Sequence, residues 1–135
     1  MREDQIIKLK QDPNYHMMVA VLGEYDDTVD YMGPNNSWKR YLIPRTLWGI
    51  DCNIASYRHD WLYFEGGNES DRLKADRLFL FDLISFIEEH HCSWPWGTRW
   101  LHRKLARSRA DKYYMAVKSQ GHKEFNYLDR DWETN

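Results

Sequence analysis

Residues His59, Tyr63 and Asp76 have the side-chain types and the spacing of a proton-transfer site. His59 and Tyr63 are four positions apart, so on a helix they project from the same face. Asp76 falls on the apolar stripe of a second helical segment, where an unpaired carboxylate would be costly, so it needs a partner. A histidine held by a buried carboxylate has a fixed tautomer and a raised basicity, which a general base for water requires.

Two helices must position these residues, and the sequence predicts them at about residues 53–64 and 70–90. The second segment has apolar residues at three- and four-residue spacing, the pattern of a helix with one buried face. Asn68 or Ser70 can cap its start. The connection at residues 65–68 is short and contains two glycines. A short connection favours an antiparallel helical hairpin.

The register of this hairpin brings His59 level with Asp76. Counted from Gly67 and Asn68, near which the connection is centred, His59 is about as far back along the chain as Asp76 is forward. Tyr63 lies one turn nearer the connection and can donate its hydroxyl to the same carboxylate. Helix geometry alone suits two interpretations equally, a catalytic dyad and a structural hydrogen bond in the core.

A third long helix is expected at about residues 98–120, with Gly121 as a left-handed stop. It carries seven Lys or Arg residues between Arg99 and Lys118 against a single acid, Asp111. A basic face of this kind contacts solvent, anionic lipid or nucleic-acid phosphate. The net charge of −2 favours a solvated face and disfavours nucleic acid. The inward face is expected to comprise Leu101, Leu105, Tyr113 or Tyr114, and Val117.

The whole chain, residues 1–135, is expected to form a single domain that is mainly α-helical. Its length suits one hydrophobic core, and 16% aromatic residues supply much of the core volume. Residues 2–10 are predicted to form a short helix with Ile6, Ile7 and Leu9 inward. Residues 15–23 suit a helix or a buried strand equally well. The acidic and aromatic tail after Gly121 is expected to fold back on the basic helix.

The sequence shows neither a signal peptide nor a transmembrane segment. No apolar run approaches the roughly 20 residues that span a bilayer, and the apolar stretch at the N-terminus is too short for a secretory signal. The two cysteines, Cys52 and Cys92, are too few for a disulfide framework, and the sequence allows either a bridge between them or two free thiols. We therefore expect a cytoplasmic or virion-associated protein.

Two motifs in these helices resemble the catalytic core of the phospholipase A2-like superfamily. Small prokaryotic and phage-associated members have an Arg-His-Asp-x-x-Tyr helix followed by an Arg-x-x-x-Asp-x-x-Phe helix. Here the first motif is residues 58–63 and the second is residues 72–79. The match covers roughly residues 44–90, and residues 109–117 also resemble C-terminal segments of phage-type relatives.

The resemblance implies a role for each residue of the site. His59 would be the general base that activates water, and Asp76 would orient His59 and stabilise its charged form. Tyr63 would donate a hydrogen bond to Asp76. The implied fold is phospholipase A2-like, and the implied reaction is hydrolysis of the sn-2 ester of a glycerophospholipid. Phospholipid or an anionic membrane surface is the partner that this activity needs.

The resemblance also implies a calcium ion. Asp60 would bind it, with help from the backbone carbonyls of Trp48 and Gly49, and calcium would polarise the ester carbonyl as a Lewis acid. The alternative function is that of a non-catalytic phage or bacterial structural or binding protein that retains the helical hairpin. A basic-helix module for nucleic acid is the third hypothesis.

Overall fold

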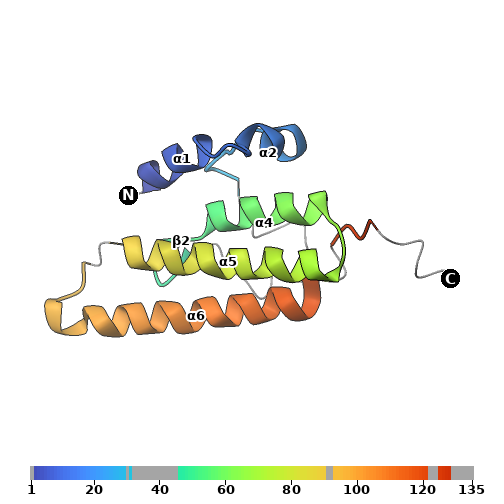
Figure 1. Ribbon diagram of the computed structural model, residues 1–135. Coiled ribbons are helices and arrows are strands. Elements are labelled where there is room, and N and C mark those ends of the chain that lie inside the picture. The colour runs from blue at the N-terminus through green and yellow to red at the C-terminus, as the bar shows by residue number, and fades with distance from the viewer. Residues whose placement is uncertain (1, 30, 32–45, 91–92, 122–124, 129–135) are drawn as a thin grey trace.

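Three long helices form the body of the protein, and two shorter ones cover one side of it (Figure 1). The computed structural model describes residues 2–29, 31, 46–90, 93–121 and 125–128. The chain is mainly α-helical, as predicted. The elements in order are α1 (Arg2–Lys10), α2 (Tyr15–Leu22), β1 (Thr46–Leu47), β2 (Ile50–Asp51), α4 (Asn53–Glu65), α5 (Glu69–Glu89), the 3-10 helix η1 (Trp96–Thr98) and α6 (Arg99–Gln120).

Helices α4 and α5 form the predicted antiparallel hairpin, and α6 runs back along α5 (Figure 1). The turn between α4 and α5 uses Gly66 and Gly67, whose φ angles of 71° and 134° few other residues adopt. Asn68 is the N-cap of α5, and its side chain accepts a hydrogen bond from the Asp71 backbone N–H. The Asp71 side chain accepts in return from the Asn68 N–H, which completes a capping box.

The inward face of α6 differs by one position from the predicted face near the start of the helix. Leu101 is 37% exposed, whereas the neighbouring His102 is buried. Small residues explain the shift, because Ala106 and Ala110 are both fully buried and allow α6 to approach its neighbours closely. The predictions for Tyr113 and Val117 are confirmed, since both residues are buried.

The end of α6 also differs from the prediction. Gly121 has a right-handed conformation, with φ −64°, so it is not a left-handed stop. Its lack of a side chain serves another purpose, because a Cβ atom there would overlap the hydroxyl of Tyr63. A glycine at this position therefore makes room for a residue of the candidate site.

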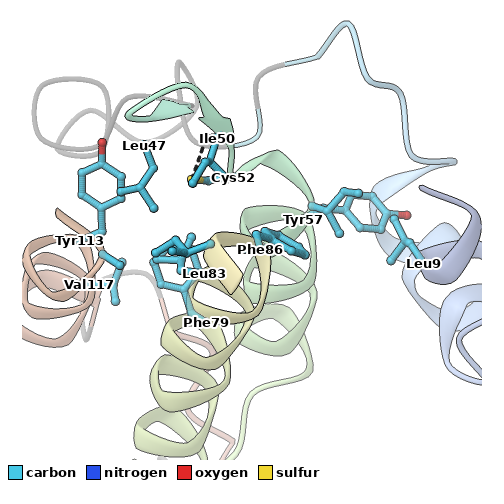
Figure 2. Packing of buried hydrophobic residues seen from close by; sticks show 14 of the residues in the cluster. Leu9, Leu47, Ile50, Cys52, Tyr57, Phe79, Leu83, Phe86, Tyr113 and Val117 are labelled. Atoms are coloured by element: carbon cyan, nitrogen blue, oxygen red, sulfur yellow. Dashed lines mark hydrogen bonds between the residues drawn. The ribbon is translucent and has the colours of Figure 1, made fainter. Parts of the chain in front are cut away.

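The hydrophobic core extends from α6 across the hairpin to α1 (Figure 2). Helix α1 has the predicted bounds and buries Leu9 completely, but Ile7 is 52% exposed and the prediction for it was wrong. Residues 15–23, which suited a helix or a buried strand equally well, form helix α2 over Tyr15–Leu22. Tyr57 of α4 is fully buried, and its hydroxyl donates to the carbonyl of Gly23 at 2.7 Å.

A small antiparallel hairpin, not predicted from the sequence, precedes α4. Strands β1 and β2 pair Thr46 with Asp51 and Leu47 with Ile50. The side chain of Asp51 then accepts a hydrogen bond from the backbone N–H of Asn53 at 2.9 Å, at the start of α4. Cys52 between them is a buried free thiol, and Cys92 lies outside the described residues.

Residues 125–128 of the C-terminal tail pack on the α4–α5 turn and not on the basic face of α6, where the tail was predicted to fold. Residues 122–124 and 129–135 of that tail lie outside the described residues. The Asn126 carbonyl accepts from the Gly67 N–H, and the Asn126 N–H donates to the carbonyl of Tyr63, both at 3.1 Å. Phe125 is buried beside the ring of Tyr63. Among the described helices, none has the length and apolar character needed to cross a membrane.

Candidate functional site

The structure brings His59 and Asp76 together, as the hairpin register predicted. Nε2 of His59, on α4, lies 2.9 Å from Oδ1 of Asp76, on α5. The hydroxyl of Tyr63 donates to the same carboxylate oxygen at 2.5 Å. The side chains of His59 and Asp76 are 1% and 0% exposed, so these contacts form in a medium of low dielectric where they are strong.

The hydrogen bond to Asp76 determines the tautomer of His59. An ionised carboxylate accepts hydrogen bonds and cannot donate them, so Nε2 of the neutral imidazole must carry the proton. The lone pair of the ring is therefore on Nδ1, the nitrogen farther from Asp76. When Nδ1 takes up a proton, the imidazolium is stabilised by the adjacent carboxylate, as in other carboxylate–histidine pairs.

Tyr63 is fixed as a hydrogen-bond donor by its surroundings. Burial raises the pKa of its phenol, and the hydrogen bond to the Asp76 carboxylate raises it further. The phenol therefore stays protonated at any physiological pH. Its ring lies 4.2 Å, centroid to centroid, from the ring of His59, and Phe79 contacts the His59 ring at 4.9 Å. These two rings restrict the orientation of the imidazole.

A buried arginine, to which no role was assigned from the sequence, completes the surroundings of Asp76. Nη1 of Arg72 lies 3.4 Å from Oδ2 of Asp76 and donates to the carbonyl of Lys118 at 3.0 Å. The carboxylate of Glu69 pairs with the other side of the guanidinium and raises the pKa of Arg72. The available signal was the four-residue spacing of Arg72 and Asp76 on one helix.

The guanidinium of Arg72 also connects the site to the C-terminal segment. The hydroxyl of Tyr127 donates to Oε2 of Glu69 at 2.5 Å, so a continuous chain of polar contacts runs from Tyr127 through Glu69 and Arg72 to Asp76. Together with Tyr63, this chain gives both oxygens of the Asp76 carboxylate a partner. The carboxylate is thereby held in one orientation toward His59.

His59 lines a cavity of about 250 Å³ between α4, α5 and the start of α2. Its apolar wall includes Met18, Leu62, Leu78 and Phe79. The guanidinium of Arg58 lies at the polar side, 3.4 Å from a carboxylate oxygen of Asp12 and 3.4 Å from one of Asp82. Burial raises the pKa of Asp82 to about 6, although Arg58 opposes the shift. His59, the apolar wall and the ion pairs of Arg58 thus share one cavity.

The residues predicted to bind calcium lie on two elements. Asp60 is on α4, whereas Trp48 and Gly49 form the β1–β2 turn. The carbonyl of Trp48 lies 2.8 Å from Nε2 of His102, which ties this turn to α6. Calcium needs six to eight oxygen ligands, and the described residues contain no group of three or more acidic, His or Cys residues that could hold a metal ion. This donor set alone does not fit calcium.

Comparisons of the chain with models of protein families, with curated proteins and with solved structures found no match. A function is therefore inferred from the geometry of the site and from the motif resemblance. The geometry contributes a buried His–Asp–Tyr–Arg cluster whose histidine lines a cavity. The resemblance contributes the class of reaction that such a cluster would serve.

Proposed function

We propose that the protein is a phospholipase A2-like lipid esterase in which His59 activates water for hydrolysis of a glycerophospholipid sn-2 ester. The observation that carries the proposal is the 2.9 Å contact between His59 Nε2 and Asp76 Oδ1, with His59 lining the 250 Å³ cavity. A histidine so held has a defined acceptor nitrogen and a partner for the charge it gains. The motifs at residues 58–63 and 72–79 support the same activity.

The proposed reaction uses Nδ1 of His59 first as a base and then as an acid. A water molecule in the cavity transfers a proton to Nδ1 while its oxygen attacks the ester carbonyl carbon. Asp76 stabilises the imidazolium that results, through the Nε2–H bond. Collapse of the tetrahedral intermediate breaks the bond to the alcohol oxygen, which takes the proton from Nδ1. The products are a fatty acid and a lysophospholipid.

The size and the lining of the cavity suit part of an acyl chain. At roughly 30 Å³ for a group the size of a water molecule, a volume of about 250 Å³ holds about eight such groups. The apolar wall of Leu62, Leu78 and Phe79 can exclude water from the chain beyond the reacting ester. Leu78 is itself 50% exposed, so this wall continues to the protein surface.

Release of free fatty acid from phosphatidylglycerol vesicles tests the proposal. We expect release by the unaltered chain and a loss of at least about 100-fold in His59→Gln, the lower range for a general base. His16→Gln is the matched control, because His16 is exposed on α2. Absence of release by the folded, unaltered protein would refute the esterase function, and equal activity in both variants would refute the role of His59.

The calcium role of Asp60 stays a separate prediction that depends on the resemblance alone. If Asp60 binds calcium, millimolar calcium should raise the thermal unfolding temperature, and Asp60→Asn should abolish the rise. Magnesium serves as the control cation, because it dehydrates reluctantly and prefers an octahedral site. An unchanged unfolding temperature in millimolar calcium would refute the metal role without affecting the proton transfer proposed for His59.

The alternative, a non-catalytic phage or bacterial structural or binding protein, is supported by the burial of the cluster. His59 is 1% exposed, and a fully buried His–Asp hydrogen bond can serve stability alone. The two functions differ in their prediction for small substrates. A soluble short-chain phospholipid should be hydrolysed at a His59-dependent rate by an esterase and left intact by a structural protein.

A further inference from the structure

Two exposed tryptophans lie at the end of the molecule where α5 gives way to α6. Trp96, in η1, is 87% exposed, and Trp100, in the first turn of α6, is 63% exposed. Figure 1 shows that the start of α6 and the end of α5 project beyond the first turn of α4 at this end. The two large amphipathic side chains are therefore carried on a projecting part of the fold.

Four basic residues surround these tryptophans on the first turns of α6. Arg99, Arg103, Lys104 and Arg107 are all exposed. Glu88 of α5 pairs with two of them, Arg103 at 3.6 Å and Arg107 at 3.8 Å, and all three side chains of this group are more than 40% exposed. Exposed pairs of this kind are weak and exchange readily for other anions. The surface is thus cationic and aromatic together.

Two hollows of about 450 Å³ each flank Trp100 along α6. The first is lined by Trp96, Trp100, Arg99 and Arg103. The second is lined by Trp100, Arg103, Lys104 and Arg107, with Asp111 at its far edge. Each hollow therefore combines an indole wall with two or more cations, which suits a phosphate group attached to an apolar body.

We propose that this end of α6, defined by Trp96, Trp100, Arg99, Arg103, Lys104 and Arg107, docks on anionic phospholipid membrane. Tryptophan side chains favour the boundary between head groups and acyl chains, and nearby Lys and Arg residues are attracted to anionic lipid. The choice of lipid as the partner rests on the proposed esterase function. The inference of a docking surface depends on the exposed indole rings and the exposed basic side chains.

A planar membrane fits this surface better than a nucleic-acid strand does. A membrane contacts the projecting end alone, where the exposed tryptophans and the basic residues coincide. A long polyanion that follows α6 leaves the exposed tryptophans behind and meets Asp111 about three turns beyond Trp100.

Co-sedimentation with vesicles tests the docking surface. The protein carries His59→Gln so that lipid is not consumed, and the vesicles are phosphatidylcholine with or without phosphatidylglycerol. We expect binding only to vesicles that contain phosphatidylglycerol, and release in high salt. Arg99→Gln with Lys104→Gln should lower the partition coefficient roughly thirtyfold, about fivefold for each basic residue near the surface. Trp96→Ala with Trp100→Ala should lower it too.

Two matched controls keep the result specific. Phe81→Ala with Met115→Ala removes exposed apolar side chains elsewhere, and Arg77→Gln with Lys112→Gln removes exposed charges elsewhere. Both controls should bind vesicles as the parent does. No binding to phosphatidylglycerol, equal losses in the controls, or tighter binding to a single-stranded oligonucleotide would overturn the proposal.

Hydrolysis of a soluble short-chain phospholipid separates this proposal from the proposed function. If hydrolysis depends on His59 but the variants at the end of α6 bind vesicles normally, the docking surface is wrong and the esterase stands. If vesicles bind through this surface and no phospholipid is hydrolysed, the proposed esterase function is wrong and the proposed docking surface is supported.

Discussion

His59 and Asp76 lie on opposite helices of the α4–α5 hairpin at nearly equal sequence distances from its turn, and Nε2 of His59 lies 2.9 Å from Oδ1 of Asp76. The contact is therefore set by the register of the hairpin. That register is held by the turn glycines and by the Asn68–Asp71 capping box. Tyr63 and Arg72 then occupy the remaining positions around the carboxylate.

Asp76→Asn should destabilise the protein strongly. The amide cannot serve as an anionic partner for Arg72, and it presents a donor where a carboxylate oxygen accepted a hydrogen bond. Removing one member of a buried charged network typically costs about 3–5 kcal/mol of unfolding free energy. Urea denaturation at neutral pH measures the loss. Asp111→Asn, on the exposed face of α6, should change the free energy by no more than about 0.5 kcal/mol.

Gly121→Ala should disturb the site through Tyr63. The new methyl group would overlap the Tyr63 hydroxyl and push it from Asp76. Overpacking of this kind typically costs about 1–3 kcal/mol of unfolding free energy. Gly97→Ala is the matched control, because a methyl group there meets no atom within 4 Å. Denaturant unfolding of both variants measures the difference.

A double-mutant cycle shows whether the cost of Gly121→Ala comes from the Tyr63 hydroxyl. In a Tyr63→Phe background the hydroxyl is absent, so most of the overlap is relieved and Gly121→Ala should cost less. Equal costs in the two backgrounds would contradict the steric explanation. An increased cost would do so as well.

The hairpin and its contact were predictable because two periodic patterns and a short loop constrain one register. Asp76 on an apolar stripe required a partner, and His59 was at the matching position. The face of α6 was less predictable, because buried Ala106 and Ala110 carry a weaker hydrophobic signal than the exposed Leu101. The β1–β2 hairpin has only two residues in each strand, which is too short for a periodic pattern.

Arg72, the third partner of Asp76 beside His59 and Tyr63, was not predictable from the hydrophobic pattern alone. Arginine is typical of a solvated helix face, yet Arg72 is only 6% exposed. Its burial is possible because Asp76, Glu69 and the carbonyl of Lys118 accept hydrogen bonds from its guanidinium. Two of those partners are close in sequence, but Lys118 comes from α6. The C-terminal segment also reaches the site through contacts remote in sequence, such as Tyr127 with Glu69.

Glu69→Gln should lower the pH midpoint at which the His59 imidazole protonates. Glu69 offsets part of the positive charge of Arg72, and without it that charge acts more fully on Asp76 and His59. A cation nearby disfavours the imidazolium. Tyr127→Phe should have a smaller effect, because it removes only one hydrogen bond to Glu69. NMR titration of the ring measures the midpoint directly.

Glu3→Gln is the control for this titration. Glu3 is exposed on α1, and its substitution removes one negative charge, as Glu69→Gln does. Its midpoint should equal that of the unaltered protein. A midpoint that rises in Glu69→Gln would contradict the predicted sign. An unchanged midpoint would show that the charge of Glu69 does not act on the His59–Asp76 pair.

Asp82 should make stability depend on pH in the direction opposite to that of most carboxylates. Burial raises its pKa from 3.8 to about 6 in the folded state, with Arg58 opposing the shift. Between these values the folded protein binds more protons than the unfolded chain, so the contribution of Asp82 to stability falls as pH rises. The shift corresponds to at most about 3 kcal/mol.

Asp82→Asn isolates this contribution, because the amide does not titrate. The unfolding free energy of the variant, relative to that of the unaltered protein, should increase by up to about 3 kcal/mol between pH 4 and pH 7. Other carboxylates titrate alike in both proteins and cancel in the difference. Asp111→Asn should show a difference that stays constant with pH. A constant difference for Asp82→Asn as well would mean that Arg58 and the cavity solvate this carboxylate as well as water does.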